Sequence, residues 1–143
     1  MGKKRVIKKS GGEGEGKQTR SSSKSAKKKL DYAVMHINAS YNNTTVNLSD
    51  KEGRVVAWSS SGSLGFKGSK KGTPFAAGKV GELLADRATD MGVKEVDIIL
   101  KGIGAGRESA IRAFVARGFV INNIKDVTPV PFNGPKRPKP RRV

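Results

Sequence analysis

The chain has 143 residues, with 29 lysines and arginines against 12 aspartates and glutamates, and a formal net charge of +17. Such a charge attracts polyanions over long range, whereas the sequence has neither the apolar span nor the amphipathic helix that membrane binding needs. Cysteine is absent and there is one histidine, which excludes disulfides and thiolate metal sites; no metal and no cofactor is predicted.

Residues 1–29 form the first predicted segment, a basic arm. It holds eleven basic residues and two acidic ones, a net charge of +9, and is mostly Gly, Ser, Lys and Glu. Because burial of so little apolar surface cannot offset the loss of conformational entropy on ordering, we expect the arm to be disordered when alone. A solubilising or targeting tail is the alternative to a nucleic-acid arm. The arm lacks the Arg-rich, amphipathic pattern of a transit peptide, which favours nucleic acid.

A globular domain is predicted over residues 30–126, and it opens with three strands. Apolar and polar residues alternate from Ala33 to Ala39, and two further strands are predicted at residues 44–49 and 54–60. Short strands joined by tight turns predict an antiparallel meander. His36 lies within the alternation and is expected to be an ordinary strand residue.

A glycine-rich basic loop and a helix follow the meander. Residues 61–72 carry Phe66 among three lysines; such a loop suits a folded RNA surface, although Phe66 could equally lie in the core. Thr73 is predicted as the N-cap of the helix, which ends at Gly92. Gly78 and Gly81 inside this helix each cost about 1 kcal/mol relative to alanine, so we expect a close backbone contact there.

The stretch from Val93 to Phe114 combines a strand, a glycine-rich turn and a helix N-terminus. Its apolar run over residues 96–100 is typical of a strand covered on both faces. The turn Gly102-Ile103-Gly104-Ala105-Gly106-Arg107 lets the backbone approach a ligand, and the helix after it directs amides and partial positive charge there, which favours an anion. The alternative is a sharp turn without a ligand. Arg107, a cation placed where a phosphate would lie, favours the anion.

That phosphate could belong to a nucleotide cofactor or to a nucleic acid backbone. The dinucleotide fingerprint needs a third glycine where this chain has Arg107, and no lysine followed by Ser or Thr closes a P-loop. The basic composition therefore favours nucleic acid.

A last strand is predicted within residues 119–128, and a tail over residues 127–143. Strand, helix and strand in this order imply a right-handed parallel crossover, so a mixed sheet with helices is expected. The tail has five basic residues, no acidic ones and five prolines. Because proline keeps a chain extended, we interpret the tail as a second basic arm.

Three motifs occur in order along the chain. They are FKGSKKGTPFAA from Phe66, KGIGAGRES from Lys101, and DVTPVP from Asp126 followed by Asn133-Gly134. Together they resemble the family of small-subunit ribosomal protein eleven, and the resemblance extends from about Tyr32 to Val143. The ending of the chain looks like the bacterial type, although Ile103 and Ala105 stand where the family usually has prolines.

The resemblance implies an α/β fold, with a three-layer body whose mixed five-stranded sheet is flanked by helices, similar to ribonuclease H-like folds. It implies a non-enzymatic, structural constituent of the small ribosomal subunit in the cytoplasm. Such a protein binds and bridges ribosomal RNA helices on the platform and helps form the Shine-Dalgarno cleft for mRNA. Small-subunit ribosomal proteins seven and eighteen and the third initiation factor are the implied neighbours.

The resemblance also implies RNA contacts in four segments. These are Asn42, Asn43 and Thr44; Gly65, Phe66, Lys67, Gly68, Ser69, Lys70, Lys71 and Thr73; Gly104, Gly106 and Arg107; and Asn133, Gly134, Lys136, Arg137, Lys139, Arg141 and Arg142.

Two other classes of protein share some of these features. A nuclease of ribonuclease H type would need carboxylates that converge on a two-metal site, and nothing in the pattern indicates that Asp50, Asp97 and Asp126 converge. An architectural DNA-binding protein shares the charge, but it usually shows a groove-reading helix or ribbon.

Overall fold

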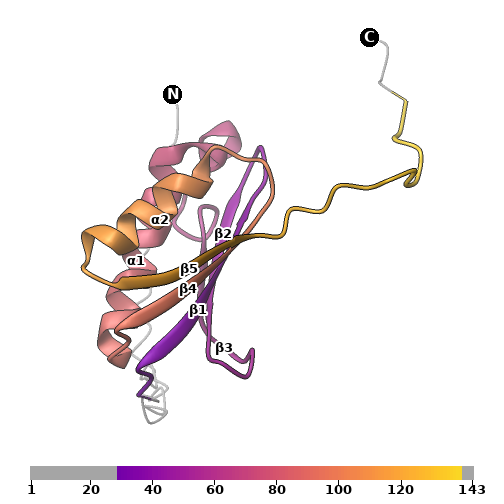
Figure 1. Cartoon of the computed structure of the whole chain (residues 1–143). Coiled ribbons are helices and arrows are strands. Elements are labelled where there is room, and N and C mark those ends of the chain that lie inside the picture. Colours follow the sequence, from indigo (N-terminus) through magenta and orange to yellow (C-terminus); the bar gives the residue numbers. More distant parts are fainter. Residues whose placement is uncertain (1–28, 140–143) are drawn as a thin grey trace, which may run out of the picture.

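The computed structural model of the chain describes residues 29–139. Its elements follow the predicted order (Figure 1): β1 (Tyr32–Ala39), β2 (Thr44–Ser49), β3 (Val55–Ser60), the 3-10 helix η1 (Gly68–Gly72), α1 (Pro74–Met91), β4 (Glu95–Lys101), α2 (Gly106–Ala116) and β5 (Val120–Asp126). Only η1, inside the basic loop, was not predicted from the sequence. The first 28 residues of the predicted arm, together with Arg141 and Arg142, lie outside the described residues.

The five strands form one mixed sheet in the order β3-β2-β1-β4-β5. β1, β2 and β3 pair antiparallel, as the meander prediction requires, while β4 is parallel to β1 and β5 is parallel to β4. The α/β class and the mixed five-stranded sheet are therefore confirmed. Since β1, β3, β4 and β5 run in the same direction, their C-terminal ends lie at one end of the sheet.

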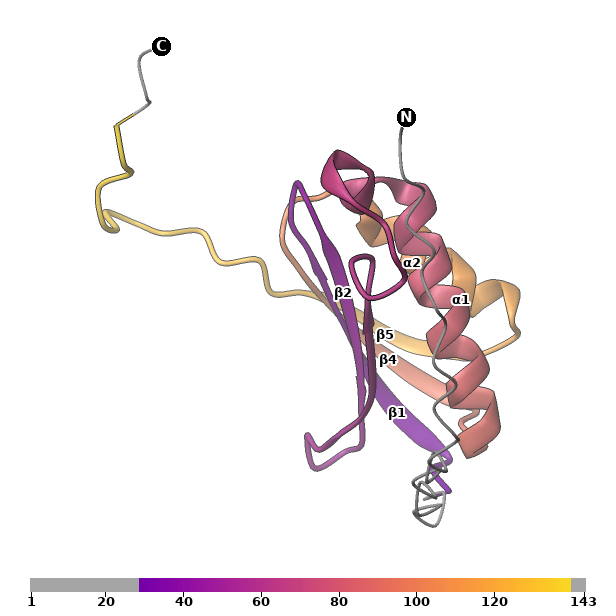
Figure 2. The ribbon, with the colours of Figure 1, turned by 180° about the vertical axis from the view of Figure 1, so that it is seen from behind.

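Both helices cover the same face of the sheet, as Figures 1 and 2 show from opposite sides. The crossovers through α1 and through α2 both advance across the sheet toward β5, so a common handedness places both helices on one side. The described residues consequently form two layers, where the resemblance implied three. β4, expected to be covered on both faces, buries Val96 and Ile98 under the helices but leaves Asp97 and Ile99 half-buried on the other face.

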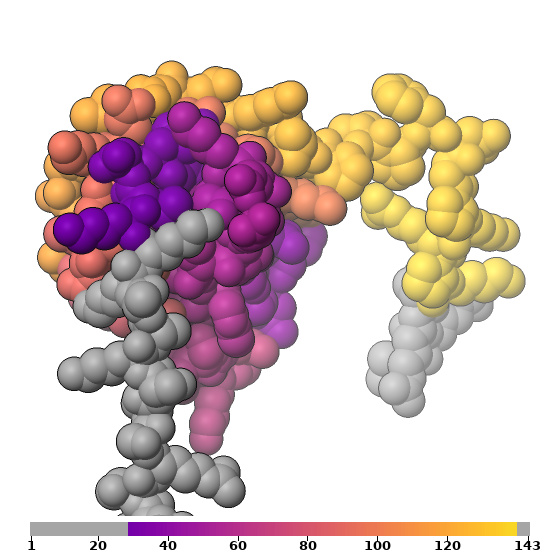
Figure 3. All heavy atoms as spheres, turned by 90° about the horizontal axis from the view of Figure 1, so that it is seen from below, coloured from indigo at the N-terminus to yellow at the C-terminus, as the bar shows by residue number. Residues whose placement is uncertain are grey.

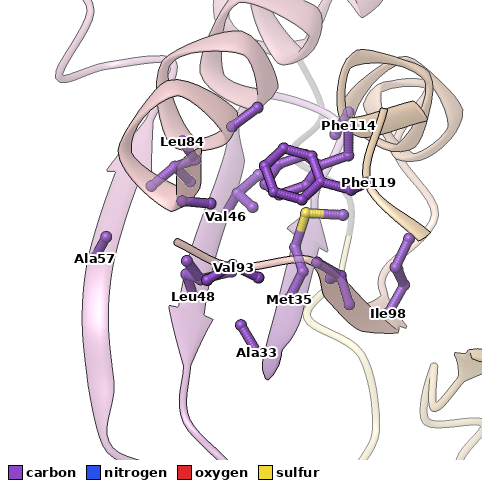
Figure 4. Close-up of a cluster of buried hydrophobic side chains, with 14 of the residues drawn as sticks. Ala33, Met35, Val46, Leu48, Ala57, Leu84, Val93, Ile98, Phe114 and Phe119 are labelled. Atoms are coloured by element: carbon purple, nitrogen blue, oxygen red, sulfur yellow. The ribbon is translucent and has the colours of Figure 1, made fainter. Parts of the chain in front are cut away.

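The hydrophobic core lies between this sheet face and the two helices (Figure 4). Met35 and Ile37 of β1 are buried and alternate with more exposed residues, as the period of a strand requires. Phe114 of α2 is fully buried, and its ring centroid lies 5.2 Å from that of Phe119. Burial of such a side chain contributes about 1.5–3 kcal/mol, so Phe114 is a main attachment of α2 to the sheet.

The ends of α1 are as predicted. The Thr73 side chain accepts a hydrogen bond from the Ala76 amide at 3.3 Å, and Pro74 occupies the first turn. Gly92 ends the helix in the left-handed region, with φ of 83°. The helix is thus delimited by residues adjacent to it in the sequence.

The two glycines inside α1 have different surroundings. A Cβ at Gly81 would lie 2.8 Å from the Cβ of Ala113 and 2.9 Å from the carbonyl oxygen of Ala110, so this glycine allows α1 and α2 to approach closely. A Cβ at Gly78 would meet no described atom within 4 Å. The predicted close contact is confirmed at Gly81 and is wrong at Gly78.

These two positions provide a matched pair of substitutions. Gly78→Ala should raise the free energy of unfolding by up to about 1 kcal/mol, because alanine is the better helix former. Gly81→Ala should lower it, because overpacking at a helix contact costs about 1–3 kcal/mol. Urea denaturation of both variants measures the difference, and equal stabilisation by the two alanines would contradict the close approach of the helices.

Candidate nucleic-acid interface

The segments predicted to contact RNA leave the same end of the sheet. We use the name loop cluster for the β1–β2 turn (40–43), the loop after β3 (61–73) and the turn after β4 (102–105). They lie together at the top of the body in Figure 1. The tail starts after β5, whose C-terminal end belongs to the same end of the sheet.

A buried hydroxyl joins the β1–β2 turn to the loop after β3. Ser61 Oγ lies 2.7 Å from Asn43 Oδ1 and 2.7 Å from the carbonyl oxygen of Lys71. Gly72 passes so close to the turn that any side chain there would overlap the Tyr41 carbonyl group. The two segments are therefore held in one arrangement within the folded chain.

The glycines of the turn after β4 face the protein. Side chains at Gly102 and Gly104 would overlap backbone carbonyl groups at residues 39–40, and one at Gly106 would overlap Thr44 Oγ1. The Gly104 amide donates a hydrogen bond to the Ala39 carbonyl at 2.9 Å. These glycines thus let the turn pack against the end of β1, which supports the alternative of a tight structural turn.

Arg107 forms an ion pair within its own chain. Its Nη1 lies 3.1 Å from Oδ2 of Asp126, at the end of β5. The other carboxylate oxygen accepts hydrogen bonds from the hydroxyl of Thr128 at 2.6 Å and from its amide at 2.8 Å. Thr128 Oγ1 in turn accepts one from the Gly102 amide at 3.1 Å. We call these four residues the tail latch, because they attach the start of the tail to the glycine turn.

The tail latch should make the stability of the folded chain depend on pH in the acid range. The Thr128 hydroxyl and amide, followed by the Arg107 guanidinium, hold the pKa of Asp126 below its usual range. The latch therefore stabilises the folded chain above the unfolded pKa of about 3.9, and this contribution is lost as the pH falls through the lower folded pKa. We expect Asp126→Asn to lack this part of the pH dependence, measured as Tm against pH. Identical profiles for the two chains would contradict the latch.

Two of the three lysines in the loop after β3 are open to solvent. Lys67 and Lys70 are exposed and Lys71 is half-buried. Within residues 29–139 the ion pairs involve other side chains, so none of these three lysines is neutralised there. They present positive charge that a phosphate backbone can bind.

Phe66 is neither fully exposed on the loop nor buried in the core. It is half-buried and packs edge to face on Phe75, with ring centroids 6.1 Å apart and an interplanar angle of 85°. Phe75 itself is 67% exposed. The Phe75 ring thus packs against Phe66 and leaves part of the Phe66 ring accessible.

Several other predicted contact residues serve the fold. Asn43 donates from Nδ2 to Thr45 Oγ1 at 3.3 Å, in addition to its contact with Ser61. Thr44 is fully buried, and its Oγ1 has no hydrogen-bond partner among the described residues. Thr73 caps α1. Their contacts with RNA stay predictions.

The remaining predicted residues are accessible. They are Asn42, Gly65, Gly68 and Ser69 in the loop cluster, and Asn133, Gly134, Lys136, Arg137 and Lys139 in the tail. The tail extends away from the body (Figure 3), with a bend at Asn133, whose φ of 51° lies in the left-handed region that asparagine tolerates.

Four exposed aromatic side chains of residues 29–139 were not among the predicted contact residues. Phe132 in the tail is 92% exposed, Tyr41 in the β1–β2 turn 81%, Phe75 in the first turn of α1 67% and Trp58 on β3 59%. The sequence did carry signals for two of them. Tyr41 stands in a polar turn, and Trp58 alternates with small residues along a strand, which predicts an exposed position.

The carboxylates considered for a nuclease site lie apart. Asp50 follows β2 and Asp126 ends β5, at opposite ends of the sheet. Asp97 lies within β4, in register with Val34 of β1. Residues 29–139 contain no group of three acidic or histidine side chains placed to hold a metal ion. In the same part of the chain, no helix has the length and apolarity to cross a membrane.

A small α/β body with basic loops at one end and a basic tail is typical of a structural nucleic-acid-binding protein. The profile of the family described as Ribosomal protein S11 matches residues 33–142. Small ribosomal subunit protein uS11 of Thermosipho melanesiensis is 52% identical over 128 residues, which cover 89% of this chain and 98% of that protein. The protein of the same name from Thermotoga maritima is 50% identical over 123 residues, or 86% and 95% of the two chains.

The chain therefore belongs to the ribosomal protein S11 family, in its bacterial form. This confirms the resemblance seen in the three motifs. Members of this family are structural constituents of the small ribosomal subunit and act in translation without being enzymes, so the nuclease alternative is set aside.

Proposed function

We propose that the chain binds and bridges helices of small-subunit ribosomal RNA through two separate regions, the loop cluster and the tail. The observation that carries this proposal is the gathering of three loops at one end of the sheet, with Lys67 and Lys70 exposed there. The tail bears Lys136, Arg137 and Lys139 at a distance from the body (Figure 3). Cations in two places suit RNA segments that are far apart in the RNA sequence.

The loop cluster supports this function because it is arranged before binding. The Ser61 hydroxyl and the close backbone contacts of Gly72 and Gly104 fix the three loops to one another. RNA binding then orders fewer groups, and less conformational entropy opposes it. We assign the phosphate contacts mainly to the lysines, while Arg107 holds the tail latch.

Membership of the family supports a finer placement. We propose that the protein lies on the platform of the subunit and helps form the cleft that receives the Shine-Dalgarno duplex of mRNA. Small-subunit ribosomal proteins seven and eighteen and the third initiation factor would be its neighbours. In this arrangement residues 30–126 act as the body and residues 127–143 as an independent arm, joined at the tail latch.

Paired lysine substitutions test the loop cluster. The double variant Lys67→Ala, Lys70→Ala should weaken binding to a small-subunit ribosomal RNA fragment and lower the slope of log affinity against log salt by about 1 for each lysine that contacts a phosphate. The measurement is a binding titration at several salt concentrations.

The matched control is Lys51→Ala, Arg54→Ala, which removes two charges from the β2–β3 turn at the opposite end of the sheet. We expect this control to bind RNA nearly as the unmodified chain does. If both double variants lose affinity and salt dependence equally, binding is general attraction to a polycation, and an architectural DNA-binding protein becomes the better description.

A further inference from the structure

No described element covers the sheet face opposite the helices (Figures 1 and 2). We call it the open face. The strand register places one row of side chains across its middle: Trp58, Asn47, His36, Ile99 and Lys125, one from each strand. With strands about 4.8 Å apart, this row is about 19 Å long.

Trp58 is the largest exposed ring of this row. Its strand neighbours Ala57 and Ser59 are buried toward the helices, whereas Trp58 is 59% exposed. Arg87 of α1 donates a hydrogen bond from Nη1 to the Trp58 carbonyl oxygen at 3.1 Å, which holds the edge strand in place. The ring is therefore a large apolar group in solvent on a fixed backbone.

Polar side chains accompany the ring. Asn47 pairs in register with Trp58, and His36 pairs with Asn47. His36 Nε2 lies 3.0 Å from Ser49 Oγ, so this ring is held in one orientation. An aromatic ring beside amide and imidazole groups provides both stacking and hydrogen bonds for an unpaired RNA base.

Charge differs between the two ends of the open face. Toward the loop cluster, Lys101 and Lys125 are exposed, and within residues 29–139 neither forms an ion pair. At the opposite end lie Glu95 and Asp97, and a hydrogen bond to the Asp97 carboxylate raises the pKa of Tyr32. Lys51 Nζ also lies at this end, 4.6 Å from the centroid of the Tyr32 ring. The open face therefore carries unpaired positive charge toward the loop cluster and charges of both signs at the other end.

The tail adds to this asymmetry. It leaves the body on the side of the open face, as both views of the ribbon show. Its cations Lys136, Arg137 and Lys139 therefore lie on the same side as Lys101 and Lys125, away from the helices. This complementarity favours a nucleic acid over a protein as the occupant of the face.

We infer that the open face binds a single-stranded segment of RNA, with a base stacked on Trp58 and the backbone crossing the sheet toward Lys125 and Lys101. The inference rests on the proposed function and deepens it. It adds a third contact surface, separate from the loop cluster and the tail, and specifies unpaired RNA as its ligand. Four-stranded RNA-binding sheets that hold two or three bases by stacking show that such a surface is large enough.

The single tryptophan makes the inference directly measurable, because Trp58 is the only one in the chain. Titration of the full chain with a short single-stranded oligoribonucleotide, at about 0.15 M salt, should quench the tryptophan emission. A duplex RNA of the same length should bind without comparable quenching, because its bases are already stacked on one another.

Substitution tests the contribution of the ring to affinity. Trp58→Leu should weaken single-strand binding about 5- to 150-fold, which corresponds to one stacked base, when binding is followed by the anisotropy of labelled RNA. Trp58→Phe keeps an aromatic ring and should retain most of the affinity, which separates loss of stacking from loss of folding. Tyr32→Leu, which removes a ring at the end of the same face away from the loop cluster, should bind as the unmodified chain does.

The outcomes separate the inference from the proposed function. Equal quenching by duplex and single strand, or unchanged affinity in Trp58→Leu, would overturn the open-face site while leaving the loop cluster intact. RNA binding that is insensitive to Lys67→Ala, Lys70→Ala but sensitive to Trp58→Leu would support the open face and overturn the loop cluster. If the unmodified chain binds neither the single-stranded nor the duplex RNA, the open-face inference and the proposed function both fail.

Discussion

The packing of the glycine turn after β4 against the end of β1 is the constraint on which the proposed RNA-binding end of the molecule depends. Gly104 hydrogen-bonds to Ala39, and neither it nor Gly106 has room for a side chain. Because this turn is also the start of α2, its position fixes where the helix begins and where Arg107 lies. Arg107 then pairs with Asp126 and attaches the tail. One close backbone contact therefore places a helix, a loop and an extended arm relative to one another.

The charge distribution assigns different tasks to the parts of the chain. Residues 30–126 carry a net charge of only +3, whereas the segments before and after them carry +9 and +5. A nearly neutral body can pack without strong self-repulsion and still present Lys67 and Lys70 at one end. Under the proposed function, the extensions would supply most of the long-range attraction to RNA. Specific placement would then come from the body, whose loops are fixed by internal hydrogen bonds.

Local sequence patterns predicted the helices and strands well. They could not predict contacts between residues that are far apart in the sequence. The alternation from Ala33 to Ala39 and the cap at Thr73 are encoded within a few residues, so strands and helix ends were found. The pairing of Arg107 with Asp126 joins residues 19 positions apart, and in the sequence Arg107 looked like a ligand for phosphate. The glycines near it were interpreted as an opening for a ligand. The structure packs them against residues 39–44, and their contact with RNA stays a prediction. The two-layer arrangement follows from strand order, which local periodicity does not contain.

Hydrogen exchange of the full chain, free and assembled into small ribosomal subunits, tests the central claim most directly. If the loop cluster and the tail form the RNA-binding end, amides in residues 40–43, 61–73 and from 127 onward should gain protection on assembly. The β2–β3 turn, at the opposite end of the sheet, should exchange at the same rate in both states. Protection confined to that turn or to the exposed sides of α1 and α2, with the loop cluster unchanged, would contradict the account.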